Sequence, residues 1–147
     1  EGLLGTVGLL YPNPVLPENS SYYEHYLRFG WPTPGNNDKV VQVDLVGHSW
    51  FFKKEWLSYF SRELPDPKYN TCGEDMHFSY MLQKYANIPT FVPPHPKDNM
   101  ELWGSLKGGE YGGDANSLWT SNQTNVEATP FRQVMNEYFR DVHFTYD

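Results

Sequence analysis

Residues 73–85 read GEDMHFSYMLQKY, and their apolar positions carry the clearest structural signal in the chain. Four of them follow the i, i+3, i+4, i+7 spacing of a helix that packs one face against a core: Phe78, Met81, Leu82 and Tyr85. The spacing predicts a helix that starts at Glu74 and continues to about Tyr85.

Two acids stand at the start of this predicted helix. Because each residue turns a helix by about 100°, Glu74 is expected within the apolar stripe, Asp75 at its edge beside Leu82, and Ser79 and Gln83 on the opposite, solvated face. Free backbone N–H groups and the helix dipole favour anions in a first turn. The acid pair therefore has two interpretations, compensation of the dipole alone or a functional site at the floor of a pocket.

The remaining pattern alternates strands with helices. Buried strands are expected over 3–11, where glycines interrupt the run, over 40–47 and over 88–92. Helices are expected over 50–59 and 129–142, with a short one within 20–29. This order predicts a mixed α/β fold in which residues 1–147 form a single unit and the three strands belong to a larger sheet.

Composition narrows the class of function. The chain has 147 residues, which is one domain or part of one. A net charge of −7 argues against nucleic acid as a partner, since phosphates need a basic face. Five Trp and eleven Tyr suit amphipathic ligands such as sugar rings. The single cysteine excludes an internal disulfide and fits a reducing compartment, although the cytoplasm, a membrane facing it and the Golgi lumen all stay open. Because the chain begins at Glu1 without methionine, we expect further residues upstream.

Several short motifs occur in a fixed order along the middle of the chain. They are VDLVGHSWFF at 43–52, GEDMH at 73–77, Ile88-Pro89-Thr90, Val92-Pro93-Pro94-His95 and Trp103-Gly104-Ser105. The ordered set resembles the C-terminal, acceptor-side half of a GT-A fold glycosyltransferase, similar to family 2. The resemblance covers roughly residues 40–106, a little under half of the chain.

The resemblance implies a partial GT-A sheet flanked by helices, a nucleotide-sugar donor, expected to be a uridine diphosphate sugar, and a glycan or other hydroxyl acceptor. Such enzymes hold Mn²⁺ or Mg²⁺ through an Asp-x-Asp motif in their N-terminal half, and no Asp-x-Asp occurs in this sequence. The donor-binding half would therefore be a missing partner, and this chain alone a poor catalyst. His95 would add one metal ligand, with His48, His77 and His143 as alternatives.

The same resemblance assigns the catalytic acids. Asp75 would be the general base that accepts the proton of the acceptor hydroxyl, and Glu74 would orient the acceptor, although the reverse assignment stays open. Four further residues would contact donor or acceptor: His48, Trp50, Trp103 and Lys107. Three of the residues assigned by the resemblance also have plainer interpretations: core packing for Trp50, an ordinary loop histidine for His95, and a surface loop rich in glycine for Lys107.

Two other classes of protein fit the composition. A carbohydrate-binding module explains the aromatic residues and the acidic charge without catalysis, and it needs no acid pair at a helix start. A glycoside hydrolase needs two carboxylates on either side of the bond, at a separation of about 5 to 9.5 Å. Asp44 or Asp98 would have to supply the second carboxylate, because neighbours on one helix rarely lie on both sides of a substrate.

Overall fold

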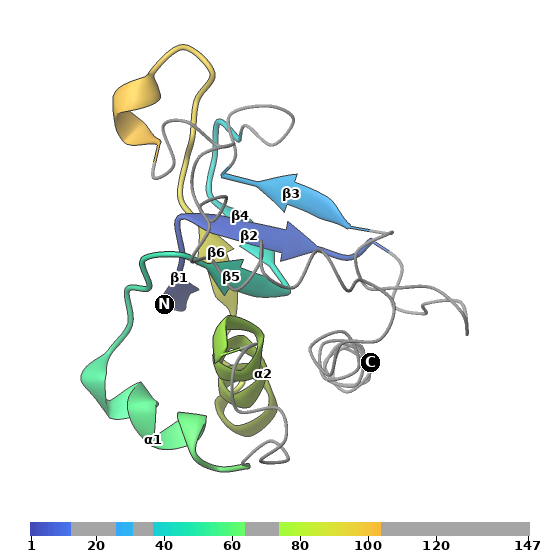
Figure 1. Ribbon diagram of the computed structural model, residues 1–147, viewed down its shortest axis with the longest axis vertical. Helices are drawn as coiled ribbons and strands as arrows, with labels where there is room; N and C mark the ends of the chain where they lie inside the picture. The colour runs from blue at the N-terminus through green and yellow to red at the C-terminus, as the bar shows by residue number, and fades with distance from the viewer. Residues whose placement is uncertain (13–25, 31–36, 64–73, 104–147) are drawn as a thin grey trace, which may run out of the picture.

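The computed structural model describes residues 1–12, 26–30, 37–63 and 74–103. These residues form a mixed α/β fold with two small sheets and few helices (Figure 1). The predicted α/β class is therefore confirmed. The predicted helix over 129–142 lies outside the described residues.

Each sheet has three strands. In the first sheet the central strand β6 (Thr90–Val92) pairs in parallel with β1 (Leu3–Leu4) and antiparallel with β4 (Val41–Val43). In the second sheet the central strand β2 (Val7–Leu10) pairs antiparallel with β3 (Leu27–Phe29) and with β5 (Leu45–Gly47). One short segment, 27–29, is thus a strand where the sequence led us to expect helix.

Two stretches of chain serve both sheets. β1 continues into β2 through Gly5 and Thr6, and β4 continues into β5 through Asp44. At the first junction the two stretches nearly touch, since a Cβ added to Gly5 would lie 2.4 Å from Cβ of Val46. The sequence located both stretches correctly, but each is divided between two sheets where we had expected one continuous strand.

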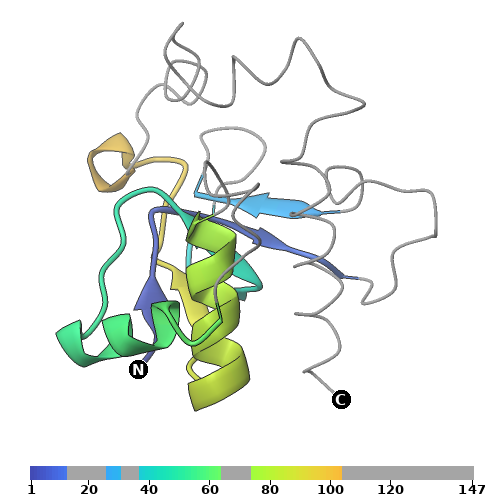
Figure 2. The ribbon, with the colours of Figure 1, turned by 60° about the horizontal axis from the view of Figure 1, so that its bottom comes forward.

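The two α-helices lie side by side, and the 3₁₀ turn at Met100–Leu102 lies apart from them (Figure 1). Residues Lys54–Trp56 form the 3₁₀ turn η1, Leu57–Phe60 form α1, Glu74–Ala86 form α2, and Met100–Leu102 form the 3₁₀ turn η3. α2 confirms the main prediction from the sequence, and it packs against both α1 and β5 (Figure 2). The helix predicted over 50–59 begins only at Lys54, because Phe51 instead forms a β-bridge with Leu4. No helix among the described ranges has the length and apolar character needed to cross a bilayer.

α2 is buried on more than one face. Every residue from Met76 to Leu82 is buried, because the sheets cover one side of the helix and α1 another. The wet face that we expected at Ser79 is therefore wrong: this side chain is 1% exposed, and Gln83 is half-buried. Tyr85, expected in the packed stripe, is 43% exposed, and its hydroxyl donates to the carboxylate of Glu63.

An aromatic cluster joins α2 to the segment before α1. The ring of Phe78 lies 5.7 Å from Trp50, 5.0 Å from Phe52 and 5.7 Å from Phe60, measured between ring centroids. Phe78 is fully buried, and its neighbours in the core are Leu3, Val43, Val46, Leu82 and Val92. This cluster holds the first turn of α2 against the end of β5, which is where the candidate site lies.

Candidate active site

Asp75 lies in the first turn of α2 with its carboxylate against the protein. Its Oδ1 accepts a hydrogen bond of 2.7 Å from the backbone N–H of Met76, one of the free N–H groups of the helix start. Burial raises the pKa of the Asp75 carboxyl from 3.8 to about 6, and the neighbouring charge of Glu74 adds to this rise, while backbone hydrogen bonds offset part of it. A carboxyl with such a pKa is ionised at neutral pH and still accepts protons readily.

The carboxylate of Asp75 rests on a glycine. A Cβ at Gly47, the last residue of β5, would lie 3.2 Å from Oδ2 of Asp75 and 3.5 Å from the side chain of Val7. Any larger residue at this position would push against the acid. This contact could not be predicted from local sequence patterns, because 28 positions separate the two residues along the chain.

The chain leaves β5 through a tight turn beside this contact. His48 and Ser49 have φ values of 54° and 45°, which is the left-handed region that non-glycine residues seldom adopt. Thr6 holds the turn, since its N–H and its Oγ1 both donate to the carbonyl of His48, at 3.2 and 3.3 Å. Two consecutive strained residues at a strand end are a feature often found at binding sites.

We predicted His48 at the end of a strand and Glu74 within the packed stripe of its helix, and the structure bears out only the first of these placements. His48 follows Gly47 directly and is therefore close to Asp75 in the fold; its side chain is exposed, yet desolvation lowers the pKa of its ring. Glu74 is exposed and does not lie within the packed stripe. Asp75 is half-buried and lies against Gly47, so it is the acid that faces the protein.

His95 is the second notable group. It is 1% exposed, its Nδ1 lies 2.7 Å from the carbonyl oxygen of Pro93, and its Nε2 is buried without a hydrogen-bond partner among the described residues. Because a carbonyl only accepts, Nδ1 carries the proton and Nε2 of the neutral ring presents a lone pair. Backbone hydrogen bonds with Asn37, of 2.6 and 3.3 Å, hold this residue in place.

His95 lies in the segment that follows β6, whereas Asp75 lies in the first turn of α2. α2 and β6 run in opposite directions (Figure 2), so the first turn of α2 points toward the end of the sheet at which β6 ends. Trp103 is half-buried, and its Nε1 donates a 2.7 Å hydrogen bond to the carbonyl of Pro96. Its indole therefore braces the loop that carries His95.

The other predicted binding residues are placed differently. Trp50 packs against Phe78, which matches the core-packing interpretation, and its Nε1 is buried with no hydrogen-bond partner in the part of the chain that the structure describes. Lys107 lies outside the described residues. No group of three potential metal ligands is present within 1–12, 26–30, 37–63 and 74–103. His95 therefore offers a single ligand, and the described residues do not make up a metal site by themselves.

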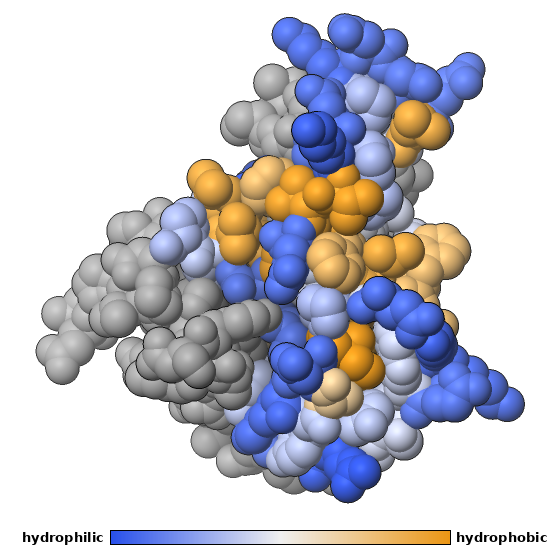
Figure 3. Space-filling model, turned by 180° about the vertical axis from the view of Figure 1, so that it is seen from behind, coloured by the Kyte–Doolittle hydropathy of each residue, from blue (hydrophilic) through white to orange (hydrophobic). Residues whose placement is uncertain are grey.

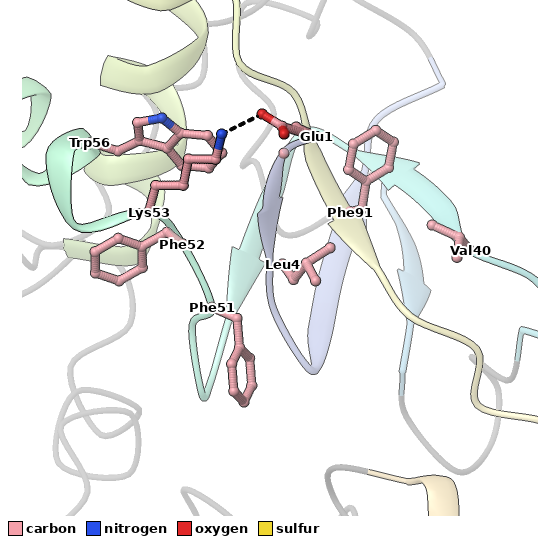
Figure 4. A pocket seen from close by; sticks show the side chains of 9 residues that line it. Glu1, Leu4, Val40, Phe51, Phe52, Lys53, Trp56 and Phe91 are labelled. Atoms are coloured by element: carbon pink, nitrogen blue, oxygen red, sulfur yellow. Dashed lines mark hydrogen bonds and ion pairs between the residues drawn. The ribbon is translucent and has the colours of Figure 1, made fainter.

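An apolar groove of about 440 Å³ lies elsewhere on the surface, on the outer side of the first sheet (Figure 4). Its walls include Leu4, Phe51, Trp56 and Phe91. An ion pair of 2.6 Å between Nζ of Lys53 and a carboxylate oxygen of Glu1 crosses one end. Apolar side chains also gather across the middle of the face opposite to that of Figure 1 (Figure 3). Neither acid of α2 lines the groove, so it is separate from the candidate active site.

Asp44 is a titratable residue whose environment the sequence did not reveal. It is 7% exposed at the junction of β4 and β5, and its Oδ2 accepts a 2.6 Å hydrogen bond from the backbone N–H of Tyr11. Burial raises the pKa of this carboxyl from 3.8 to about 6, and the hydrogen bond offsets only part of the rise. Its burial could have been predicted from its position between two strands rich in valine, because such strands are usually buried.

The buried carboxyl makes stability depend on pH. Between pH 3.8 and about 6 the folded state holds this proton more tightly than the unfolded chain, so stability is highest below that range and falls as the pH rises through it. A shift of this size corresponds to ~3 kcal/mol. We expect Asp44→Asn to reduce the loss of unfolding free energy between about pH 4 and pH 7 by ~2–3 kcal/mol, measured by urea denaturation.

The matched control is Asp98→Asn, which changes an exposed aspartate. It should leave the pH dependence as in the parent chain. Asp75 titrates in the same window, so a smaller dependence remains in Asp44→Asn. An identical pH slope in Asp44→Asn and in the parent would contradict the assignment of this carboxyl.

Comparison with known proteins gives no match: no family model, curated protein or solved structure is significantly similar to this chain.

Proposed function

We propose that this chain is the acceptor-side half of a GT-A fold glycosyltransferase, and that Asp75 is its general base. The substrates are a nucleoside diphosphate sugar and an acceptor hydroxyl, with uridine as the expected nucleoside. The observation that carries the proposal is the Asp75 carboxylate, which is half-buried against Gly47 with its pKa raised to about 6. A carboxylate that served only to compensate the helix dipole would not need this burial.

In this reaction the proposed role of this chain is to accept one proton, from the acceptor hydroxyl. The acceptor oxygen attacks the anomeric carbon of the donor sugar, the bond from that carbon to the diphosphate breaks, and the diphosphate keeps the electron pair. The acceptor O–H proton passes to the carboxylate of Asp75, which must therefore be ionised beforehand. Its pKa of about 6 leaves the carboxylate ionised at neutral pH and more basic than an exposed aspartate.

Neighbouring groups support this role. His48 lies next to the glycine beneath the acid, at a turn fixed by Thr6, and its lowered pKa keeps its ring neutral, so that it can hydrogen-bond an acceptor hydroxyl. Glu74 is exposed in the first turn of α2, next to Asp75, where a carboxylate can bind sugar hydroxyls. Asp75 is the better candidate for the base, because its pKa is raised by burial.

Donor and metal binding fall mostly to residues outside this sequence. A divalent metal, when bound, supplies positive charge for the leaving diphosphate. The buried, unpartnered Nε2 of His95 fits one ligand of such an ion. The remaining ligands would come from an Asp-x-Asp motif in a donor-binding half, which we propose as the partner of this chain.

The test measures which compounds the protein consumes. In an enzyme that joins this chain to its donor-binding half, we expect release of nucleoside diphosphate that requires both a nucleotide sugar and a glycan acceptor. Binding of glycan with no need for nucleotide or metal, and no turnover, would instead identify a carbohydrate-binding module. Release of free sugar from a glycoside in the absence of any nucleotide sugar would identify a hydrolase.

A further inference from the structure

The edge of β5 that does not pair with β2 lies against α2, and the backbone along it forms hydrogen bonds with side chains of that helix. Among the described strands β5 has one neighbour, β2, so its other edge faces α2. Two backbone groups of this stretch bond to α2 instead of to a further strand. The N–H of Val46 donates to Oγ of Ser79 at 3.3 Å, and the carbonyl of Asp44 accepts from Nε2 of Gln83 at 2.8 Å.

The helix side of this contact is a regular row. Asp75, Ser79 and Gln83 are spaced by four residues, so they lie on one face of α2. Oγ of Ser79 also donates to the carbonyl of Asp75 at 2.8 Å, and Nε2 of Gln83 donates to the carbonyl of Ser79 at 2.9 Å. We call these three residues the polar row; it runs along the chain from Asp44 to Gly47.

The partners on the strand follow the same order. Gln83 meets Asp44, Ser79 meets Val46, and Asp75 meets Gly47, so helix and strand run in opposite directions with their polar groups in step. Apolar packing alone is not directional and tolerates small shifts along the helix axis, whereas hydrogen bonds fix both distance and angle. A shift of α2 by one residue, about 1.5 Å along its axis with a rotation of about 100°, would break both contacts and move the acid off the glycine.

We propose that Ser79 and Gln83 are positioning residues that hold α2 in register with β5 and thereby keep the Asp75 carboxylate against Gly47. Neither side chain acts on a substrate. Their effect on catalysis rests on the proposed function, because the position of Asp75 affects catalysis only if Asp75 is the base. The positional claim itself concerns the fold of this chain and is measurable without any sugar.

The experiment measures the pKa of Asp75 by carboxyl ¹³C NMR in this chain, in the parent and in Ser79→Ala. The variant removes the hydroxyl that links Val46 to Asp75. We expect the pKa of Asp75 to fall from about 6 toward 3.8, because the carboxylate loses part of its burial when the helix is no longer held. The titratable groups near it, Glu74 and His48, are unchanged in both proteins.

The matched control is Ser58→Ala. Ser58 donates to the carbonyl of Glu55 on the exposed side of α1, so its loss also removes one serine hydrogen bond to a helix carbonyl. It should leave the pKa of Asp75 at the parent value. An unchanged pKa of Asp75 in folded Ser79→Ala would overturn the proposal.

A second pair of variants covers the case in which Ser79→Ala does not fold. Gln83→Met keeps the length of the side chain and removes the donor to Asp44, while Gln42→Met makes the same change at an exposed position of β4. We expect the pKa of Asp75 to fall in Gln83→Met and to stay at the parent value in Gln42→Met. Equal pKa values in those two variants would also overturn the proposal.

The experiments distinguish failure of the positioning role of Ser79 and Gln83 from failure of the catalytic role of Asp75. Normal sugar transfer by an enzyme that lacks the Asp75 carboxylate removes the catalytic role but leaves the NMR result intact. If both proposals hold, Ser79→Ala lowers kcat with little change in the KM of the donor. It also moves the acidic limb of the pH–rate profile to lower pH, which a merely destabilised enzyme would not show.

Discussion

Asp75→Asn in the complete enzyme is expected to lower the rate of sugar transfer by about 100-fold to 10,000-fold, which is the usual contribution of a general base. Asparagine keeps the size of the side chain and an oxygen for the N–H of Met76, so the fold and donor binding should persist. The measurement is nucleoside diphosphate release at saturating donor, together with the dissociation constant of the donor. A loss in kcat with unchanged donor affinity is the expected pattern.

The pH dependence of the parent enzyme provides a second measurement of the same role. The carboxylate must be ionised to accept a proton, so kcat/KM should rise with pH up to about 6 and then level off. Asp98→Asn, an exposed aspartate that lies outside the proposed site, should reproduce the parent profile. Near-normal turnover in Asp75→Asn would remove this residue from the role of base and would leave Glu74 as the acid to examine.

Phe78→Ala is expected to destabilise the fold by about 3–5 kcal/mol, the usual cost of removing a buried aromatic ring. Phe78 is fully buried, and its ring contacts the rings of Trp50, Phe52 and Phe60. Alanine leaves a cavity between α2 and the segment before α1 that these rings cannot close by small movements. Urea denaturation followed by tryptophan fluorescence measures the change, since Trp50 reports on the same cluster.

The matched control for this substitution is Phe51→Ala, which removes the same ring from a side chain that is 65% exposed. We expect a change below about 1 kcal/mol for the control. Similar losses in both variants would mean that the cluster around Phe78 does not form the main contact between α2 and the sheets.

The sequence predicted the parts of the fold whose pattern is local. Periodic apolar residues located α2 to within one residue of its end, and β-branched runs located the chain of β4, β5 and β6. It also marked Asp75 as an acid near the packed side of a helix, and the structure places it there. These features depend on residues that are neighbours in the sequence, so a single chain contains the information.

The errors came from contacts between distant segments. Periodicity shows which residues of α2 share a face, but it does not show that α1 and β5 cover two different faces. Ser79 and Gln83 were therefore assigned to solvent, although their hydrogen-bond partners lie more than 30 positions away. The strand at 27–29 was assigned to a helix for a similar reason, since its pairing with β2 is what defines it.

Two stretches of chain run from one sheet directly into the other, and this has a consequence for how the protein unfolds. Neither sheet can separate without pulling on a segment that also belongs to the other, because β1 continues into β2 and β4 continues into β5. The described residues therefore have no internal seam along which one half could melt first. Amide protons in both sheets should exchange with solvent through the same global unfolding. Asp75 therefore loses its contact with Gly47 only when both sheets unfold.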